Sequence, residues 1–181
     1  MRMHVKARQV AFLGLLAAIN SILIFFASLF ESNTLFLLVA ASYLVGIAIQ
    51  EFGLRIGTGF FVACTVLGFL LSPNKLYVLT YLGFSLYIVW YEVAYWRLSK
   101  MHNLKLKQIS FFLAKLIFFN IVYLSSIFLF PQLLVSVNMS NLVILIIIVG
   151  GQVGWLIFDK AYEYFLAVIW GKFRRKIAFL F

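Results

Sequence analysis

Charged residues are scarce in this chain of 181 residues: they make up 11% of it, and only five of them are acidic. Soluble domains carry about 25% charged residues and are about half apolar. In this chain 65% of the residues are hydrophobic. The composition excludes an ordinary soluble domain and predicts an integral membrane protein.

Cysteine is almost absent as well, since Cys64 stands alone. One cysteine excludes a disulfide framework and a cysteine-based metal site. The two histidines, His4 and His102, lie in polar segments. The sequence holds no His-Glu-x-x-His pattern, no Gly-x-Ser-x-Gly elbow and no phosphate-binding loop. We therefore expect no enzyme activity, no metal and no cofactor.

Six apolar runs are long enough to cross a bilayer, which takes roughly 20 residues, with about 17 to 25 tolerated. They cover residues 10–30, 34–50, 54–71, 76–96, 109–130 and 142–158. Apolar character resumes in "FLAVIWGKF" after the sixth run, so the last helix either ends near 158 or continues to 170. No repeat or linker divides the chain. We expect one all-α domain over 1–181, a bundle of six transmembrane helices.

Basic residues predict the orientation, because lysine and arginine accumulate in short cytoplasmic loops. With the N-terminus inside, fourteen basic residues fall on the cytoplasmic side and Lys75 alone falls outside. We therefore expect both termini in the cytoplasm. The net charge of +10 is first a signal of topology and second a source of attraction to anionic lipid. It does not indicate a nucleic-acid partner.

The first apolar run carries a narrow face of small residues. Ala7, Ala11, Gly14 and Ala18 are spaced by four, three and four, which returns to the same side of a helix. In lipid, helices associate by close backbone approach through such residues. This face either packs inside the chain's own bundle or forms a docking surface for another membrane subunit. The same kind of spacing recurs in two glycine pairs, Gly53 with Gly57 and Gly150 with Gly154.

The small face, within "ARQVA" and "GLLAA", resembles the docking motif on the first helix of S components, the substrate-binding membrane subunits of energy-coupling factor transporters. The length, six runs and orientation resemble that family too. The stretches "EFGLRIGTGFF" and "LSPNKLYVLTYLGF" are similar to uncharacterised six-helix proteins of low-GC Gram-positive bacteria. The resemblance implies a multi-pass protein of a bacterial cell membrane, with a coupling subunit and ATPase subunits as partners.

Polar and aromatic residues gather toward the end that this topology places outside. Amide and hydroxyl groups above an aromatic wall suit a small, partly polar organic ligand. Ordinary loop chemistry with an interfacial aromatic belt is the alternative. The candidate ligand-binding residues are Asn33, Asn74, Tyr81, Asn120, Tyr123, Gln152 and Trp155.

Charged residues inside spans are costly and usually pair or face a bundle interior. We expect Glu92, Lys115 and Asp159 to form a cluster that closes the cytoplasmic end. The alternative is that their long side chains extend to the interface. We place these charges in the cytoplasmic third of the membrane, which argues against an ion-coupled carrier that works alone.

Together these features predict a substrate-capture subunit of an ATP-driven vitamin or metabolite uptake transporter. It would bind its ligand from outside and dock on a coupling subunit through its first helix. A non-transport scaffold or assembly protein of the cell envelope is the alternative.

The charge asymmetry makes a direct prediction about topology. Single cysteines at Asn74 and Asn138, in a background without Cys64, should react with a membrane-impermeant thiol reagent added to intact cells. A cysteine at Asn103 should stay unlabelled until the membrane is permeabilised. Labelling of Asn103 alone would reverse the predicted orientation.

Overall fold

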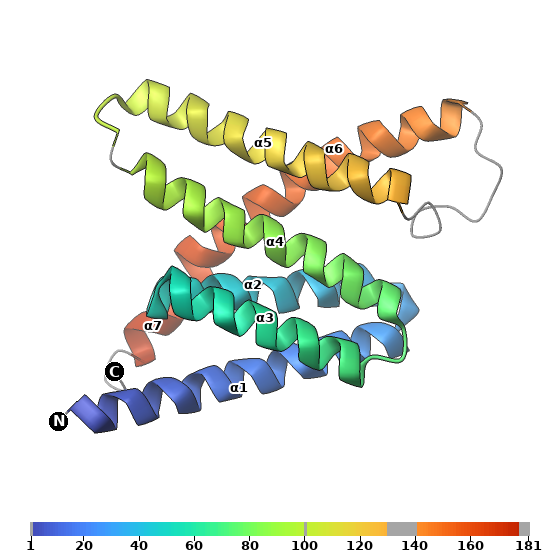
Figure 1. Ribbon diagram of the computed structural model, residues 1–181. Helices are drawn as coiled ribbons and strands as arrows, with labels where there is room; N and C mark the ends of the chain where they lie inside the picture. Colours follow the sequence, from blue (N-terminus) through green and yellow to red (C-terminus); the bar gives the residue numbers. More distant parts are fainter. Residues whose placement is uncertain (1, 100, 130–140, 178–181) are drawn as a thin grey trace.

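The computed structural model describes residues 2–99, 101–129 and 141–177, and they form an all-α fold (Figure 1). The elements in chain order are α1 (Arg2–Leu29), the 3-10 turn η1 (Glu31–Asn33), α2 (Thr34–Phe52), α3 (Leu54–Leu71), α4 (Lys75–Leu98), α5 (Leu104–Leu129), α6 (Asn141–Tyr164), the π-helical stretch η3 (Phe165–Trp170) and α7 (Gly171–Ile177). Residues 141–177 are helical without a break. Of the two alternatives for the last helix, the structure therefore has the continuous one.

Five of the described helices, α1 to α5, are long and apolar enough to cross a membrane. Several apolar helices of this kind fit a multi-pass membrane protein. The sixth predicted span, 142–158, lies within α6. The side chains of 141–145 are outside the described residues, so this span stays a prediction.

Two helices are longer than the apolar runs that predicted them. The helix α1 begins at Arg2 rather than near residue 10, and α5 begins at Leu104 rather than 109. The bilayer limits the length of the apolar part of a helix, not the length of the helix. Lysine, arginine and glutamine are good helix formers, so the backbone ladder continues into the polar flanks.

Both ends of the chain lie at one end of the bundle, together with the α2–α3 and α4–α5 turns (Figure 1). We call this the terminal end and the opposite one the distal end. The C-terminal run is attached to α2 at the terminal end. The indole N–H of Trp170 donates to Glu51 Oε1 at 3.0 Å, and Arg174 Nε lies 3.0 Å from the same oxygen.

Residues in the short turns satisfy backbone groups at the helix ends. Gly53, between α2 and α3, has a φ of 84°, which favours glycine, and its N–H donates to Ile49 O. At the distal end Asn74 accepts a hydrogen bond from Leu76 N at 3.0 Å and so caps α4. The ammonium of Lys75 donates to Ser72 O at 2.8 Å, at the carboxyl end of α3.

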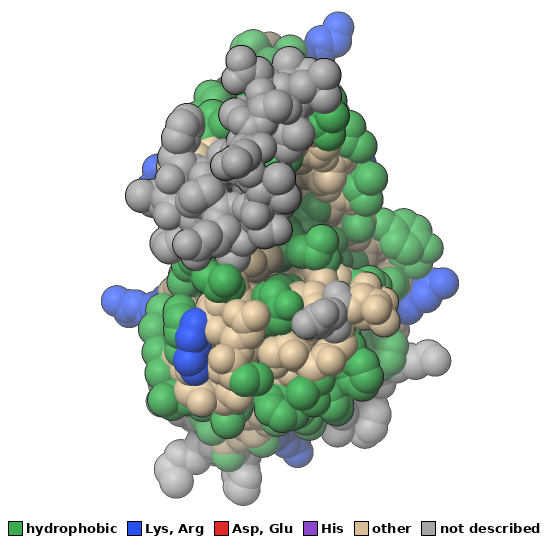
Figure 2. All heavy atoms as spheres, turned by 90° about the vertical axis from the view of Figure 1, so that its right-hand side faces the viewer, with side chains coloured by type: hydrophobic (Ala, Val, Ile, Leu, Met, Phe, Trp, Pro, Cys, Tyr) green, Lys and Arg blue, Asp and Glu red, His purple; other side chains and the backbone are tan. Residues whose placement is uncertain are grey.

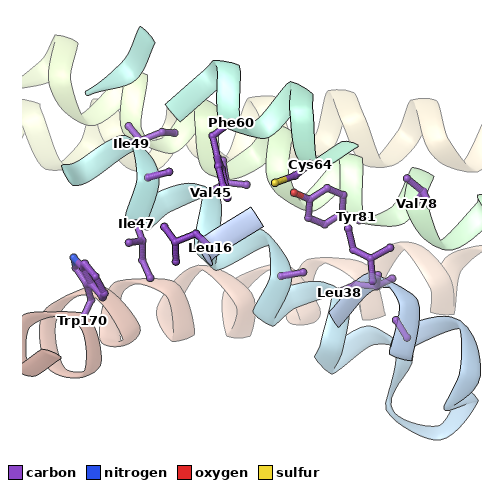
Figure 3. Close-up of a cluster of buried hydrophobic side chains, with 14 residues drawn as sticks. Leu16, Leu38, Val45, Ile47, Ile49, Phe60, Cys64, Val78, Tyr81 and Trp170 are labelled. Carbon is purple, nitrogen blue, oxygen red and sulfur yellow. The ribbon is translucent and has the colours of Figure 1, made fainter. Parts of the chain in front are cut away.

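The helices α1 to α4 enclose an apolar core (Figure 3). Leu38, Val45, Cys64 and Val78 are fully buried in it. The solitary cysteine thus packs as a small apolar side chain. In Figure 3 the hydroxyl of Tyr81 points toward Cys64.

The long helix α6 packs on α2 and α4 through large aromatic side chains. The Tyr162 ring lies 5.2 Å from the Tyr43 ring of α2 and 5.0 Å from the Tyr91 ring of α4, centroid to centroid. Phe158 stacks on Phe84 at 5.0 Å. The helix α5 is held differently, because Lys115 is its one fully buried side chain among those that the structure describes.

Two glycines make room for aromatic rings of neighbouring helices. A Cβ at Gly46 would overlap the hydroxyl and ring of Tyr162, and a Cβ at Gly151 would overlap Tyr123. The pairing of Gly150 with Gly154 as a close-packing site is wrong, because neither has an atom within 4 Å of an added Cβ. The neighbouring Gly151 takes the contact instead.

The fit of Tyr162 against Gly46 can be tested with one methyl group. Gly46→Ala should lower the thermal stability of the purified chain, because overpacking of this kind typically costs about 1–3 kcal/mol. Gly59→Ala is the matched control, since its Cβ meets open space. Equal melting temperatures for the two variants would show that α6 does not rest on α2 at this point.

Candidate functional site

A buried ion pair joins α5 to α6. Lys115 Nζ lies 2.6 Å from Asp159 Oδ2, and both side chains are only 3% exposed. The second carboxylate oxygen of Asp159 accepts a hydrogen bond of 2.7 Å from the hydroxyl of Tyr87 on α4. One pair of charges thus connects three helices.

The ion pair continues along α6 toward the surface. Lys115 Nζ also lies 3.1 Å from Glu163 Oε1, and Glu163 Oε2 lies 2.7 Å from Lys160 Nζ. The Lys160 side chain is 72% exposed. We call Tyr87, Lys115, Asp159, Lys160 and Glu163 the ion-pair network. Its two lysines balance its two acids, which offsets part of the desolvation cost of burying them.

Aromatic rings surround the ammonium of Lys115. Its Nζ lies 4.5 Å from the centroid of the Phe111 ring and 5.1 Å from that of Tyr91. A cation over such faces is attracted by the ring quadrupole. The rings therefore stabilise the charge on the side that the carboxylates leave open.

The ion-pair network lies near the middle of three helical runs, counted in residues. Lys115 lies near the middle of α5 (Leu104–Leu129), because that helix begins earlier than its apolar run. Tyr87 lies near the middle of α4, and Asp159 lies midway along the helical run 141–177. Because the polar flank 104–108 is part of α5, this position along the helices does not give the depth in a membrane, and the expected place in the cytoplasmic third stays a prediction.

Glu92, the third member of the expected cluster, is paired with other residues. Its Oε1 accepts hydrogen bonds from the hydroxyl of Tyr162 at 2.7 Å and from Gln50 Nε2 at 3.3 Å. These partners come from α6 and α2. The structure therefore brings Lys115 and Asp159 into contact and places Glu92 in a separate group.

Four of the seven candidate ligand residues lie on α5 and α6. Gln152 Nε2 donates to Asn120 Oδ1 at 2.7 Å, which we call the amide pair. The hydroxyl of Tyr123 donates to Ile147 O at 2.8 Å. Trp155 is buried, and its ring stacks on Phe119 with centroids 5.5 Å apart.

The other three candidates lie apart from the amide pair. Asn33 is exposed in η1, and Asn74 caps α4. Tyr81 is fully buried in the core of α1 to α4, where its hydroxyl accepts a hydrogen bond of 3.2 Å from Asn20. Figure 2 shows the distal end, whose lower half presents tan backbone and polar side chains with green apolar side chains among and around them.

Sequence reasoning missed three polar residues that the structure makes central: Asn20, Gln50 and Tyr162. Asn20 is fully buried on α1 and also donates to Ala41 O at 2.8 Å. A polar side chain in the middle of an apolar run was the available signal for it. Tyr162 follows Asp159 by three positions, so helical spacing places both on one face.

The small face of α1 points away from the bundle. Ala7, Ala11, Gly14 and Ala18 are all exposed, whereas Leu16 on the other side of the helix is buried. In this chain the bundle does not cover the face, so the alternative of internal packing does not describe it.

The ion pair predicts a particular pattern of stabilities. Lys115→Met or Asp159→Asn alone should destabilise the chain by about 3–5 kcal/mol, because each removes one member of the buried ion pair. The double variant Lys115→Met with Asp159→Asn should lose less stability than the two single losses added together. Chemical denaturation in detergent measures all three, and additive losses would contradict a coupled pair.

The candidate site thus consists of a charged group at the middle of the bundle and an amide pair between α5 and α6. The described residues contain no group of three His, Cys, Asp or Glu side chains able to hold a metal ion. Comparison with protein-family models, with curated proteins and with solved structures finds no match to this chain.

Proposed function

We propose that this chain is the ligand-capture subunit of an ATP-driven uptake transporter of a bacterial cell membrane. It binds a small organic molecule at the distal end, which faces outside, and docks on a separate transmembrane coupling subunit through α1. ATPase subunits attached to that partner supply the energy.

The exposed small face of α1 carries this proposal. Four small residues follow one another at helical spacing on the outward side, from Ala7 to Ala18. Larger side chains flank them, and Val10 and Leu15 are 70% and 59% exposed. A face of small residues lets a partner helix approach closely, and close packing is the main attraction between helices in lipid.

The amide pair supports the ligand-binding half of the proposal. Each amide offers two donors and an acceptor. Their mutual bond, together with the Asn120 bond to Leu116 O at 2.9 Å, leaves capacity for a ligand. The rings of Phe119 and Tyr123 stack on each other at 5.1 Å nearby. Amides beside aromatic faces suit a small, partly polar metabolite.

A wedge on the small face tests the docking half. Ala11→Trp should fold, remain monodisperse in detergent and keep its ligand, because Ala11 is exposed in the isolated chain. It should fail to co-purify with the coupling subunit from native membranes, and uptake in cells should fall. The measurements are affinity purification with mass spectrometry of proteins and small molecules, and uptake of the ligand so identified.

Leu70→Trp is the matched control, because Leu70 on α3 is 75% exposed and lies outside the small face. It should keep both partner and uptake. Retention of the partner by Ala11→Trp would contradict docking through this face. Recovery of cell-wall machinery instead of ATPase subunits from the wild-type chain would favour an envelope scaffold.

A further inference from the structure

Glu92 differs from the other acidic residues whose side chains the structure describes. Glu51 has Arg174 as its partner, and Asp159 and Glu163 both contact Lys115. The two hydrogen-bond partners of Glu92 are a tyrosine hydroxyl and a glutamine amide, which are both neutral. No salt bridge of the described residues includes it.

The hydrogen bonds of Glu92 are also one-sided. Both Tyr162 and Gln50 donate to the same oxygen, Oε1. Asp159 and Glu163, in contrast, each use both carboxylate oxygens. In a protonated carboxyl group one oxygen accepts hydrogen bonds and the other carries the proton. At Glu92 both donors leave Oε2 to carry the proton of a neutral acid.

The surroundings of Glu92 favour its neutral form. The residue is 8% exposed and lies between α2 and α6. Its hydrogen-bond partners are the hydroxyl of Tyr162 and the amide of Gln50, and the Tyr91 ring lies edge-on to the Tyr162 ring beside them. Lys115 lies over the Tyr91 ring but is paired with Asp159 and Glu163. A buried carboxylate without a countercharge is costly, most of all within a membrane.

We propose that Glu92 is a proton-binding site, and that the bound proton permits α6 to pack on α2 and α4 as observed. Loss of the proton leaves an uncompensated charge beneath Tyr162 and loosens α6. The packed state binds one proton more than the loosened state, so linkage favours packing at low pH and weakens it as pH rises. This site is independent of the proposed transport function.

Infrared spectroscopy of the chain in lipid at neutral pH tests the proton directly. The wild type should show the carbonyl stretching band of a protonated carboxylic acid. Glu92→Gln should lose that band, and Asp159→Asn should keep it, because the band is assigned to Glu92 and Asp159 lies in a salt bridge with Lys115. Absence of the band from the wild type, or its survival in Glu92→Gln, would overturn the proposal.

Thermal melting across a pH series tests the link to packing. The wild-type melting temperature should fall as pH rises, and that of Glu92→Gln should stay nearly constant, because glutamine mimics the neutral acid. Tyr162→Phe removes a donor that stabilises the carboxylate more than the neutral acid, so the melting temperature should fall with pH at least as steeply as in the wild type. Identical pH profiles for wild type and Glu92→Gln would overturn the coupling. If Glu92→Gln does not fold, the infrared band of the wild type still decides, since its absence at neutral pH refutes a bound proton.

Discussion

A charged side chain buried among the helices of a membrane protein needs an opposite charge inside the protein. This requirement constrains how the helices of the second half of the chain pack. Lys115 is the one fully buried side chain of α5 among those described, and it meets Asp159 at 2.6 Å. Water is not available there to stabilise either charge separately. The ion pair therefore joins α5 to α6 at a buried point, and the amide pair and the ring of Trp155 on Phe119 add further contacts between the two helices.

The rest of the bundle is held by different forces. The helices α1 to α4 share an apolar core, whereas α6 meets α2 and α4 through tyrosines that carry hydrogen bonds, with Gly46 providing the space for Tyr162. This division leaves two features available for function. The small face of α1 stays outside the core, and the amide pair of Asn120 and Gln152 lies between α5 and α6.

The sequence predicts the parts of this structure that depend on composition and local spacing. The all-α class follows from the apolar runs, and helical periodicity places Ala7 to Ala18 on one face. The partners of Glu92 could not be predicted in this way, because they depend on how α2, α4 and α6 are rotated against one another. The starts of α1 at Arg2 and of α5 at Leu104 were not predicted either. A hydropathy pattern marks the apolar part of a helix that fits in the bilayer, and the helical backbone continues beyond that part. The predicted grouping of Asn33, Asn74 and Tyr81 with the amide pair is not seen in the structure. Residues predicted at the same level of the bundle can lie on helices that face different neighbours.

The most direct test of this account is solid-state NMR of the chain in lipid, with ¹⁵N in the lysine side chains and ¹³C in the aspartate carboxyl groups. The sequence has a single aspartate, Asp159, so the carboxyl signal is unambiguous. A strong dipolar coupling between Lys115 Nζ and the Asp159 carboxyl carbon, lost in Lys115→Met, is the result that the account predicts. A carboxyl signal without coupling to any lysine nitrogen would contradict it.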